Sequence, residues 1–173
     1  ALRLSVNLSA LLLENEALRN RLLHLIRSTP LPPGWKLQVE LVEDYLQLND
    51  SELGSFLNTL RQEGVSIAID DFGRGYSSLS RLHNYPVQTV KVDYSFVRRI
   101  DALQKPSNQP LKTIQTLGRD LSLDVTAEGV ETEAQRSWLL QNGYQQGQGF
   151  LFSRPMSVAA TGEYLASSSW QQG

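Results

Sequence analysis

Short apolar segments alternate with longer amphipathic segments along this chain. The short segments predict strands near residues 2–8, 36–42, 65–70, 87–93, 123–128 and 145–151. The longer segments predict helices over 11–28, 50–63, 109–121 and 131–142, and a last helix starting near Ser157. In 11–28 and 50–63 the apolar residues recur at helical spacing. Repeated strand–helix units are typical of an α/β fold in which helices cover a parallel sheet.

Polar side chains stand at or close to the end of each predicted strand. In chain order they are Asn7, Glu40, Asp70, Asp71, Lys91, Asp93, Glu128 and Gln148. An open doubly wound sheet and a closed barrel both fit the strand–helix pattern. Because every predicted strand contributes a polar group at its carboxyl end, the pattern favours a barrel with these groups at one rim. Carboxylate and amide oxygens with one lysine suit hard divalent cations and phosphate.

Composition narrows the classes of function. The 173 residues, 40% of them hydrophobic, suit a single domain over 1–173, and no window is apolar enough to span a membrane. The absence of cysteine excludes disulfides and thiolate metal sites and is compatible with a cytoplasmic location. A net charge of −2 argues against a surface that binds nucleic acid polymers, so an anionic ligand would need local positive charge or bound metal.

Several of these residues have simpler explanations when taken alone. Asp70 and Asp71 could form a strand-end turn, with Asp71 capping a helix, and Asn7 could serve a turn as well. Lys91 lies two residues before Asp93, on the same side of a strand. A buried lysine there needs either an ion pair, with Asp93 or Glu128, or a bound phosphate.

The loop Phe72-Gly73-Arg74-Gly75-Tyr76-Ser77-Ser78 follows the two aspartates directly. Gly73 and Gly75 permit positive φ angles and close approach of the backbone, and the serines can cap a following helix. Its position after two carboxylates indicates a loop that belongs to a metal site.

Six motifs in order resemble the EAL domain family, the bacterial cyclic di-GMP phosphodiesterases and their non-catalytic relatives. They are Asn7-Leu8-Ser9, Glu40-Leu41-Val42-Glu43, Asp70-Asp71-Phe72-Gly73, Lys91-Val92-Asp93, Glu128-Gly129-Val130-Glu131 and Gln148-Gly149, and the likeness runs from about Leu4 to Met156.

The family's signature Glu-Ala-Leu precedes the Asn-Leu-Ser motif, whereas Glu16-Ala17-Leu18 follows it and lies inside a predicted helix. The sequence therefore resembles an EAL domain without its first two strands: a TIM-type barrel with about six of eight units. Open strand edges are then expected at 2–8 and 145–151.

The resemblance implies a two-metal site for Mg²⁺ or Mn²⁺. Asn7, Glu40 and Asp70 would bind the first cation, and Asp70 would bridge to a second one held by Asp71 and Asp93. The other implied roles fall to residues around these ligands: Lys91 near the attacking water, Glu128 as a metal-proximal carboxylate or general base, Gln148 on water or ligand, Glu43 anchoring the loop of Gly73 and Gly75, Glu131 in support, and Arg74 and Pro155 at the substrate. Glu131 could equally be a charge at a helix start.

Three functional classes follow from the resemblance. A metal-dependent phosphodiesterase that opens cyclic di-GMP to linear pGpG is favoured, because the chain keeps each candidate ligand within the part it contains. A cyclic di-GMP sensor without turnover and a protein-interaction domain are the alternatives. The resemblance also implies a homodimer, further sensory or GGDEF-type domains in the parent protein, and impaired activity where the signature glutamate is missing.

Overall fold

The computed structural model describes residues 2–47, 51–74, 82, 84–100 and 108–167. Its elements are, in chain order, β1 (Leu2–Asn7), α1 (Ala10–Glu14), α2 (Glu16–Ser28), β2 (Trp35–Val42), the 3-10 helix η1 (Glu43–Gln47), α3 (Ser51–Gln62), β3 (Ser66–Phe72), β4 (Thr89–Val92), α5 (Tyr94–Val97), α6 (Gln109–Asp120), β5 (Asp124–Glu128), α7 (Glu133–Gln141), β6 (Gln146–Gln148) and α8 (Val158–Ala166). In these ranges no helix is both long and apolar enough to cross a membrane.

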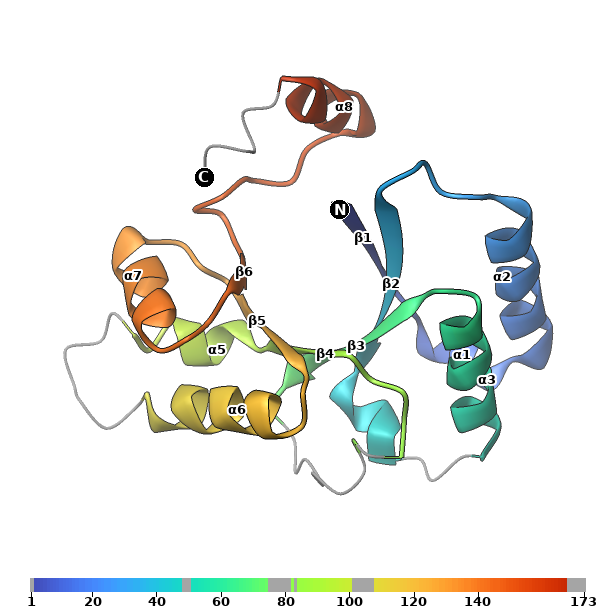
Figure 1. Cartoon of the computed structure of the whole chain (residues 1–173), viewed down its shortest axis with the longest axis horizontal. Helices are drawn as coiled ribbons and strands as arrows, with labels where there is room; N and C mark the ends of the chain where they lie inside the picture. Colours follow the sequence, from blue (N-terminus) through green and yellow to red (C-terminus); the bar gives the residue numbers. More distant parts are fainter. Residues whose placement is uncertain (1, 48–50, 75–81, 83, 101–107, 168–173) are drawn as a thin grey trace.

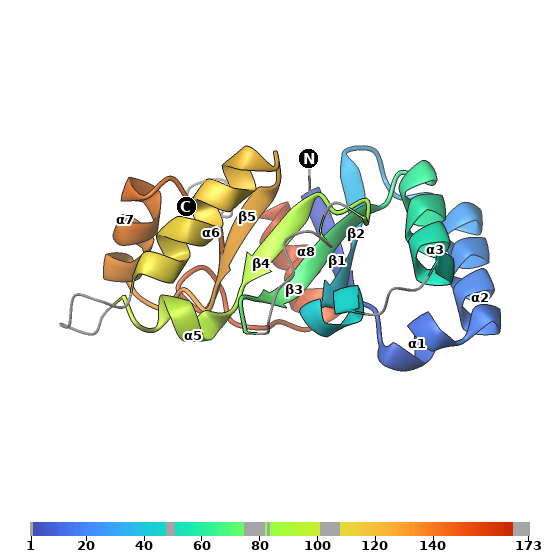
Figure 2. The ribbon, with the colours of Figure 1, turned by 90° about the horizontal axis from the view of Figure 1, so that it is seen from below.

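The strands form one parallel sheet in the order β1-β2-β3-β4-β5-β6. The sheet curves into a half-barrel, and helices α1, α2, α3, α5, α6 and α7 lie along its outer side while α8 lies apart, across the opening (Figures 1 and 2). This confirms the predicted incomplete barrel. Within the described ranges β1 and β6 are the two edge strands, as the sequence predicts.

Most predicted elements are present, but the single helix expected over 11–28 is wrong. Asn15 has an extended backbone (φ −111°, ψ 110°) and separates α1 from α2. Its side-chain oxygen accepts a hydrogen bond from the Leu18 N–H and so caps α2. Asparagine competes in this way with helix continuation, while the apolar spacing runs on through the break.

Other differences are small. The short helices η1 and α5 were not predicted, β6 is shorter than the expected 145–151, and α7 begins at Glu133 rather than at 131.

The two faces of the sheet differ in chemistry because side chains alternate along each strand. The outer face is apolar: Val39, Leu41, Ile67 and Val90 are almost fully buried. Leu57 of α3 belongs to the same buried core. On the inner face Gln38 donates to the Ser5 hydroxyl (3.1 Å) and Thr89 donates to Gln38 (3.3 Å). Two residues further along each strand the alternation places the candidate site residues on that same inner face.

Candidate active site

Lys91 on β4 is the centre of the site. Its Nζ lies 2.6 Å from Glu40 of β2, 2.7 Å from Glu128 of β5 and 3.2 Å from Asp70 of β3. Burial alone would lower the pKa of Lys91, but hydrogen bonds to Glu128 and Glu40 and the nearby charges outweigh it, so the net shift is upward. Lys91 therefore stays a charged ammonium. Of the two ion pairs that the sequence left open, the structure contains the one with Glu128.

Asp70 and Asp71 reach the same site because β3 is irregular. Neighbouring residues of a regular strand point to opposite faces. Here the register of β3 against β4 shifts between Ile69 and Phe72, and Asp71 has a φ of 55°. Such a bulge re-aims a side chain. Carboxylate oxygens of Asp70, Asp71 and Glu128 consequently lie within 4.8 Å of one another.

Asp93 follows β4 and extends this acidic group. It is fully buried, and its Oδ1 accepts a hydrogen bond from the Ser95 N–H (3.0 Å) at the start of α5. Its Oδ2 has no hydrogen-bond partner in the described part of the chain. Clustered carboxylate oxygens, one of them buried and unsatisfied, form a donor set that fits a divalent metal ion.

Crowding and burial shift the acid–base properties of these carboxyl groups. Burial raises the pKa of Glu128 to about 7, with Asp70 adding to the shift and Lys91 opposing it. Burial, the charge of Asp70 and contact with Asp93 raise the pKa of Asp71, and Arg74 lowers it. Glu128 is thus able to exchange a proton near neutral pH.

Glu43 holds the start of the loop that follows β3. Glu43 is buried, and its Oε2 accepts a hydrogen bond from the Gly73 N–H at 2.9 Å. Gly73 has a φ of 97°, and a Cβ there would lie 3.0 Å from the ring of Phe96. The positive φ favours glycine, and a side chain there would also crowd Phe96. Arg74 contacts Asp71 and Asp93. Gly75 lies outside the described residues.

The remaining predicted residues are exposed. Asn7 pairs in register with Glu40, and Gln148 pairs with Glu128, so both stand at the same rim, with exposed side chains. Glu131 is exposed and precedes α7, whose cap is Thr132, so it is not inside that helix. Pro155 is exposed in the segment between β6 and α8.

Sequence reasoning missed Gln135, which holds the turn after Glu128. Its buried side-chain oxygen accepts hydrogen bonds from the backbone N–H groups of Glu131 (2.7 Å) and Thr132 (3.1 Å). The Thr132 hydroxyl accepts one from the Gln135 N–H. This capping box was visible in the sequence as Thr132-Glu133-Ala134-Gln135.

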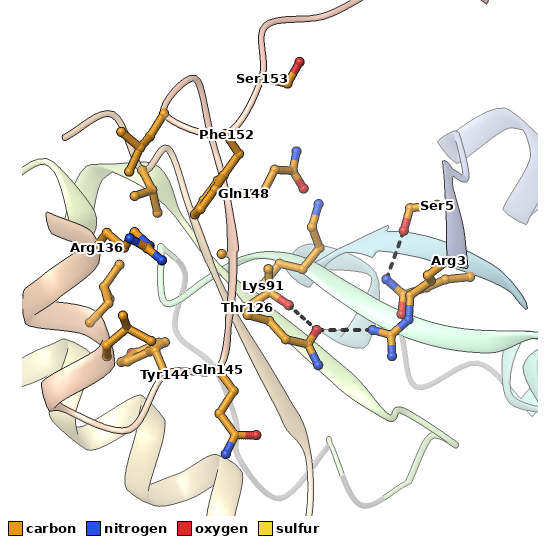
Figure 3. Close-up of a pocket in the computed structure, with 18 of the residues that line it drawn as sticks. Arg3, Ser5, Lys91, Thr126, Arg136, Tyr144, Gln145, Gln148, Phe152 and Ser153 are labelled. Atoms are coloured by element: carbon orange, nitrogen blue, oxygen red, sulfur yellow. Dashed lines mark hydrogen bonds between the residues drawn. The ribbon is translucent and has the colours of Figure 1, made fainter. Parts of the chain in front are cut away.

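A cavity of about 1180 Å³ lies in the inner face of the half-barrel. Figure 3 shows Lys91, Thr126 and Gln148 on one side of it and Arg3 and Ser5 on the other. Glu40, Lys91 and Gln148 belong both to its lining and to the rim, so the cavity opens onto the site. Arg3 spans it by donating to Gln146 at 3.3 Å and to Asp124 at 3.4 Å.

Fold and site together define a parallel α/β barrel protein with a lysine–carboxylate centre at the carboxyl ends of its strands. The chain belongs to the EAL domain family, whose model matches residues 1–155. The cyclic di-GMP phosphodiesterase NbdA of Pseudomonas aeruginosa is 40% identical over 95% of this chain and 21% of its own length. The chain spans about a fifth to a quarter of the length of the curated relatives it matches.

Two solved structures extend the likeness. The phosphodiesterase PaMucR in complex with c-di-GMP has a TM-score of 0.80 at 37% identity, covering 91% of this chain and 63% of that one. BlrP1 of Klebsiella pneumoniae, solved as a manganese/cy-diGMP complex, has a TM-score of 0.76 at 33% identity, covering 88% of this chain and 39% of that one. These EAL structures share the TIM-type barrel architecture, of which this chain forms six parallel strands.

Proposed function

We propose that the protein hydrolyses cyclic di-GMP to linear pGpG at the rim around Lys91. The observation that supports this most strongly is the contact of one buried ammonium with Glu40, Asp70 and Glu128 from three neighbouring strands. Relatives named as cyclic di-GMP phosphodiesterases support the choice of substrate.

The donor set would hold two divalent cations, Mg²⁺ or Mn²⁺. Asn7, Glu40 and Asp70 would bind the first, and Asp70, Asp71 and Asp93 the second. Bound metal of this kind lowers the pKa of a coordinated water and neutralises charge on phosphate. BlrP1 of Klebsiella pneumoniae was solved with manganese, which supports Mn²⁺ as the metal of that relative.

The chain's own groups have separate tasks in this proposal. Lys91 keeps a fixed positive charge beside the scissile phosphate. Glu128, with a pKa of about 7, accepts a proton from the attacking water. Gln148, exposed at the end of β6, donates a hydrogen bond to the phosphate or the water. Arg74 and Pro155 contact the substrate from the rim, and the Glu43–Gly73 hydrogen bond fixes the loop that bears Arg74.

The proposal extends to the full-length protein. Since the chain spans about a fifth to a quarter of its curated relatives, we place it beside sensory or GGDEF-type domains, in a homodimer, with this domain in the cytoplasm.

Hydrolysis of cyclic di-GMP by the full-length protein, followed by chromatography of the products, tests the proposal. Wild-type protein with Mg²⁺ or Mn²⁺ is expected to release pGpG, and EDTA is expected to stop turnover. Asp70→Asn should reduce turnover at least about a hundredfold because it weakens the shared ligand. Asp120→Asn, at the end of α6, is the matched control and should be unaffected.

Two outcomes would contradict the proposal. Normal turnover in EDTA, or normal turnover by Asp70→Asn, would show that the reaction does not depend on the proposed metal site. Tight binding of cyclic di-GMP without product in every variant would identify the protein as a sensor.

A further inference from the structure

We propose that Arg74 is an internal counter-ion at the second cation position, and that its side chain must leave before a cation binds there. The inference rests on the proposed function only in assuming that Asp71 and Asp93 bind a cation. It concerns a residue that would otherwise be assigned to substrate contact alone.

The geometry places one guanidinium between two carboxylates. Nη1 of Arg74 lies 3.7 Å from Oδ2 of Asp71 and 3.9 Å from Oδ2 of Asp93. The second of these oxygens is the buried one that lacks a hydrogen-bond partner in the described part of the chain. A buried carboxylate oxygen without a hydrogen bond requires a positive charge nearby. Arg74 supplies that charge across a gap too long for a hydrogen bond.

A divalent cation would stabilise the same carboxylates better than Arg74 does. Asp71 lies beside both Asp70 and Asp93, and Arg74 only partly relieves the repulsion that Asp71 experiences from them. A divalent cation in direct contact with the oxygens would relieve it more completely than a guanidinium at almost 4 Å.

Arg74 is also able to move away, in contrast to Lys91. Its side chain is 61% exposed, whereas that of Lys91 is 5% exposed and makes contacts of 2.6 to 3.2 Å. An exposed ion pair at long distance stabilises a structure only slightly. Lys91 is therefore a permanent part of the site, and Arg74 is a displaceable one.

The consequence is a penalty on cation binding at Asp71 and Asp93. A cation there must displace Arg74 and then tolerate its positive charge nearby, so it binds more weakly than it would without Arg74. Removing the charge of Arg74 should tighten this site and leave the affinity at Glu40 and Asp70 almost unchanged.

Titration of the full-length, metal-free protein with Mn²⁺, followed by the electron paramagnetic resonance signal of free Mn²⁺, tests this without measuring activity. Arg74→Gln is expected to tighten one of two Mn²⁺ sites about tenfold, the scale of two charge pairs near a surface, and to leave the other almost unchanged. Arg74→Lys keeps the charge and should remain within about twofold of wild type. Arg27→Gln removes an equal charge from the distant pair with Glu63 and is the matched control.

The outcomes separate the inference from the proposed function. If Arg74→Gln has two Mn²⁺ sites with the same two affinities as wild type, the proposed role of Arg74 is wrong and the proposed function still stands. Absence of Mn²⁺ binding in wild type and in both Arg74 variants would overturn the inference together with the two-metal proposal. Because Arg74 is exposed, the metal-free variants should have the same unfolding temperature as wild type. This measurement shows whether the variants are folded.

Discussion

Glu128 shows how its surroundings give one side chain its chemistry. Burial disfavours its charged form and raises the pKa to about 7, although Lys91 lies only 2.7 Å away and favours the carboxylate. The folded protein therefore holds a proton on Glu128 over a pH range in which the unfolded chain, with an ordinary value of 4.5, has lost it.

This difference predicts a pH-dependent stability in metal-free protein. Between about pH 4.5 and 7 the folded state binds more protons than the unfolded state, so the contribution of Glu128 is present at low pH and is lost as the pH rises through 7. After allowance for partial exposure, the loss is about 1 to 2 kcal/mol in the free energy of unfolding.

Urea unfolding in EDTA at pH 5 and pH 8 measures this loss. Glu128→Gln cannot ionise, so its unfolding free energy should fall less than that of wild type over the same interval. An equal fall in the two proteins would show that Glu128 does not titrate in this range.

Single residues also show what the sequence could predict. The meeting of Asp70, Lys91 and Glu128 followed from their places at strand ends, since parallel strands bring those ends together. The left-handed backbone of Asp71 could not be predicted, because a strand bulge depends on pairing with β4. The contacts of Arg74 likewise depend on the path of a loop.

Among the elements, the segments at the ends of β5 and β6 pack closely and are joined by backbone hydrogen bonds. The Val130 N–H donates to the Gln148 carbonyl (3.0 Å), and the Leu151 N–H donates to the Val130 carbonyl (3.1 Å). Gly149 lies against that backbone, where an added Cβ would come within 2.1 Å of the Val130 carbonyl oxygen. Since Val130 stands two residues after Glu128, this packing holds the strand end that bears Glu128.

Gly149→Ala is therefore expected to destabilise the fold by roughly 2 to 4 kcal/mol, because backbone rather than a flexible side chain must move. Gly162→Ala in α8 is the control: nothing lies within 4 Å of its added Cβ, and alanine should stabilise the helix slightly. Urea unfolding of the two variants gives the comparison. A Gly149→Ala protein as stable as wild type would mean that the two segments are not packed as closely as the structure has them.

Boundaries of elements were harder to predict than their order. The break at Asn15 was not predicted because leucines continue at helical spacing on both sides of it. The capping box at Thr132 and Gln135 was available as a pattern and would have moved the start of α7 to Glu133.

At the scale of the whole molecule, the half-barrel separates structural and chemical tasks between its two faces. The outer face supplies the apolar core with α3 and α6, and the inner face carries the polar cavity and, at its rim, Lys91 and the carboxylates. Barrel curvature was predictable because each predicted strand ends in a polar group. The Arg3 contacts with Gln146 and Asp124, which join both ends of the sheet, depend on that curvature and could not be inferred beforehand.

Whether one rim binds both metal and cyclic di-GMP is decided by a crystal structure of the full-length protein with cyclic di-GMP and Ca²⁺. Ca²⁺ accepts looser coordination than Mg²⁺ and is expected to support turnover poorly, so the substrate should remain intact. We predict cations on the carboxylates of Asp70, Asp71 and Asp93, and a phosphate within hydrogen-bond distance of Lys91. A dinucleotide bound elsewhere, with no cation on those carboxylates, would show that this rim is not the binding site.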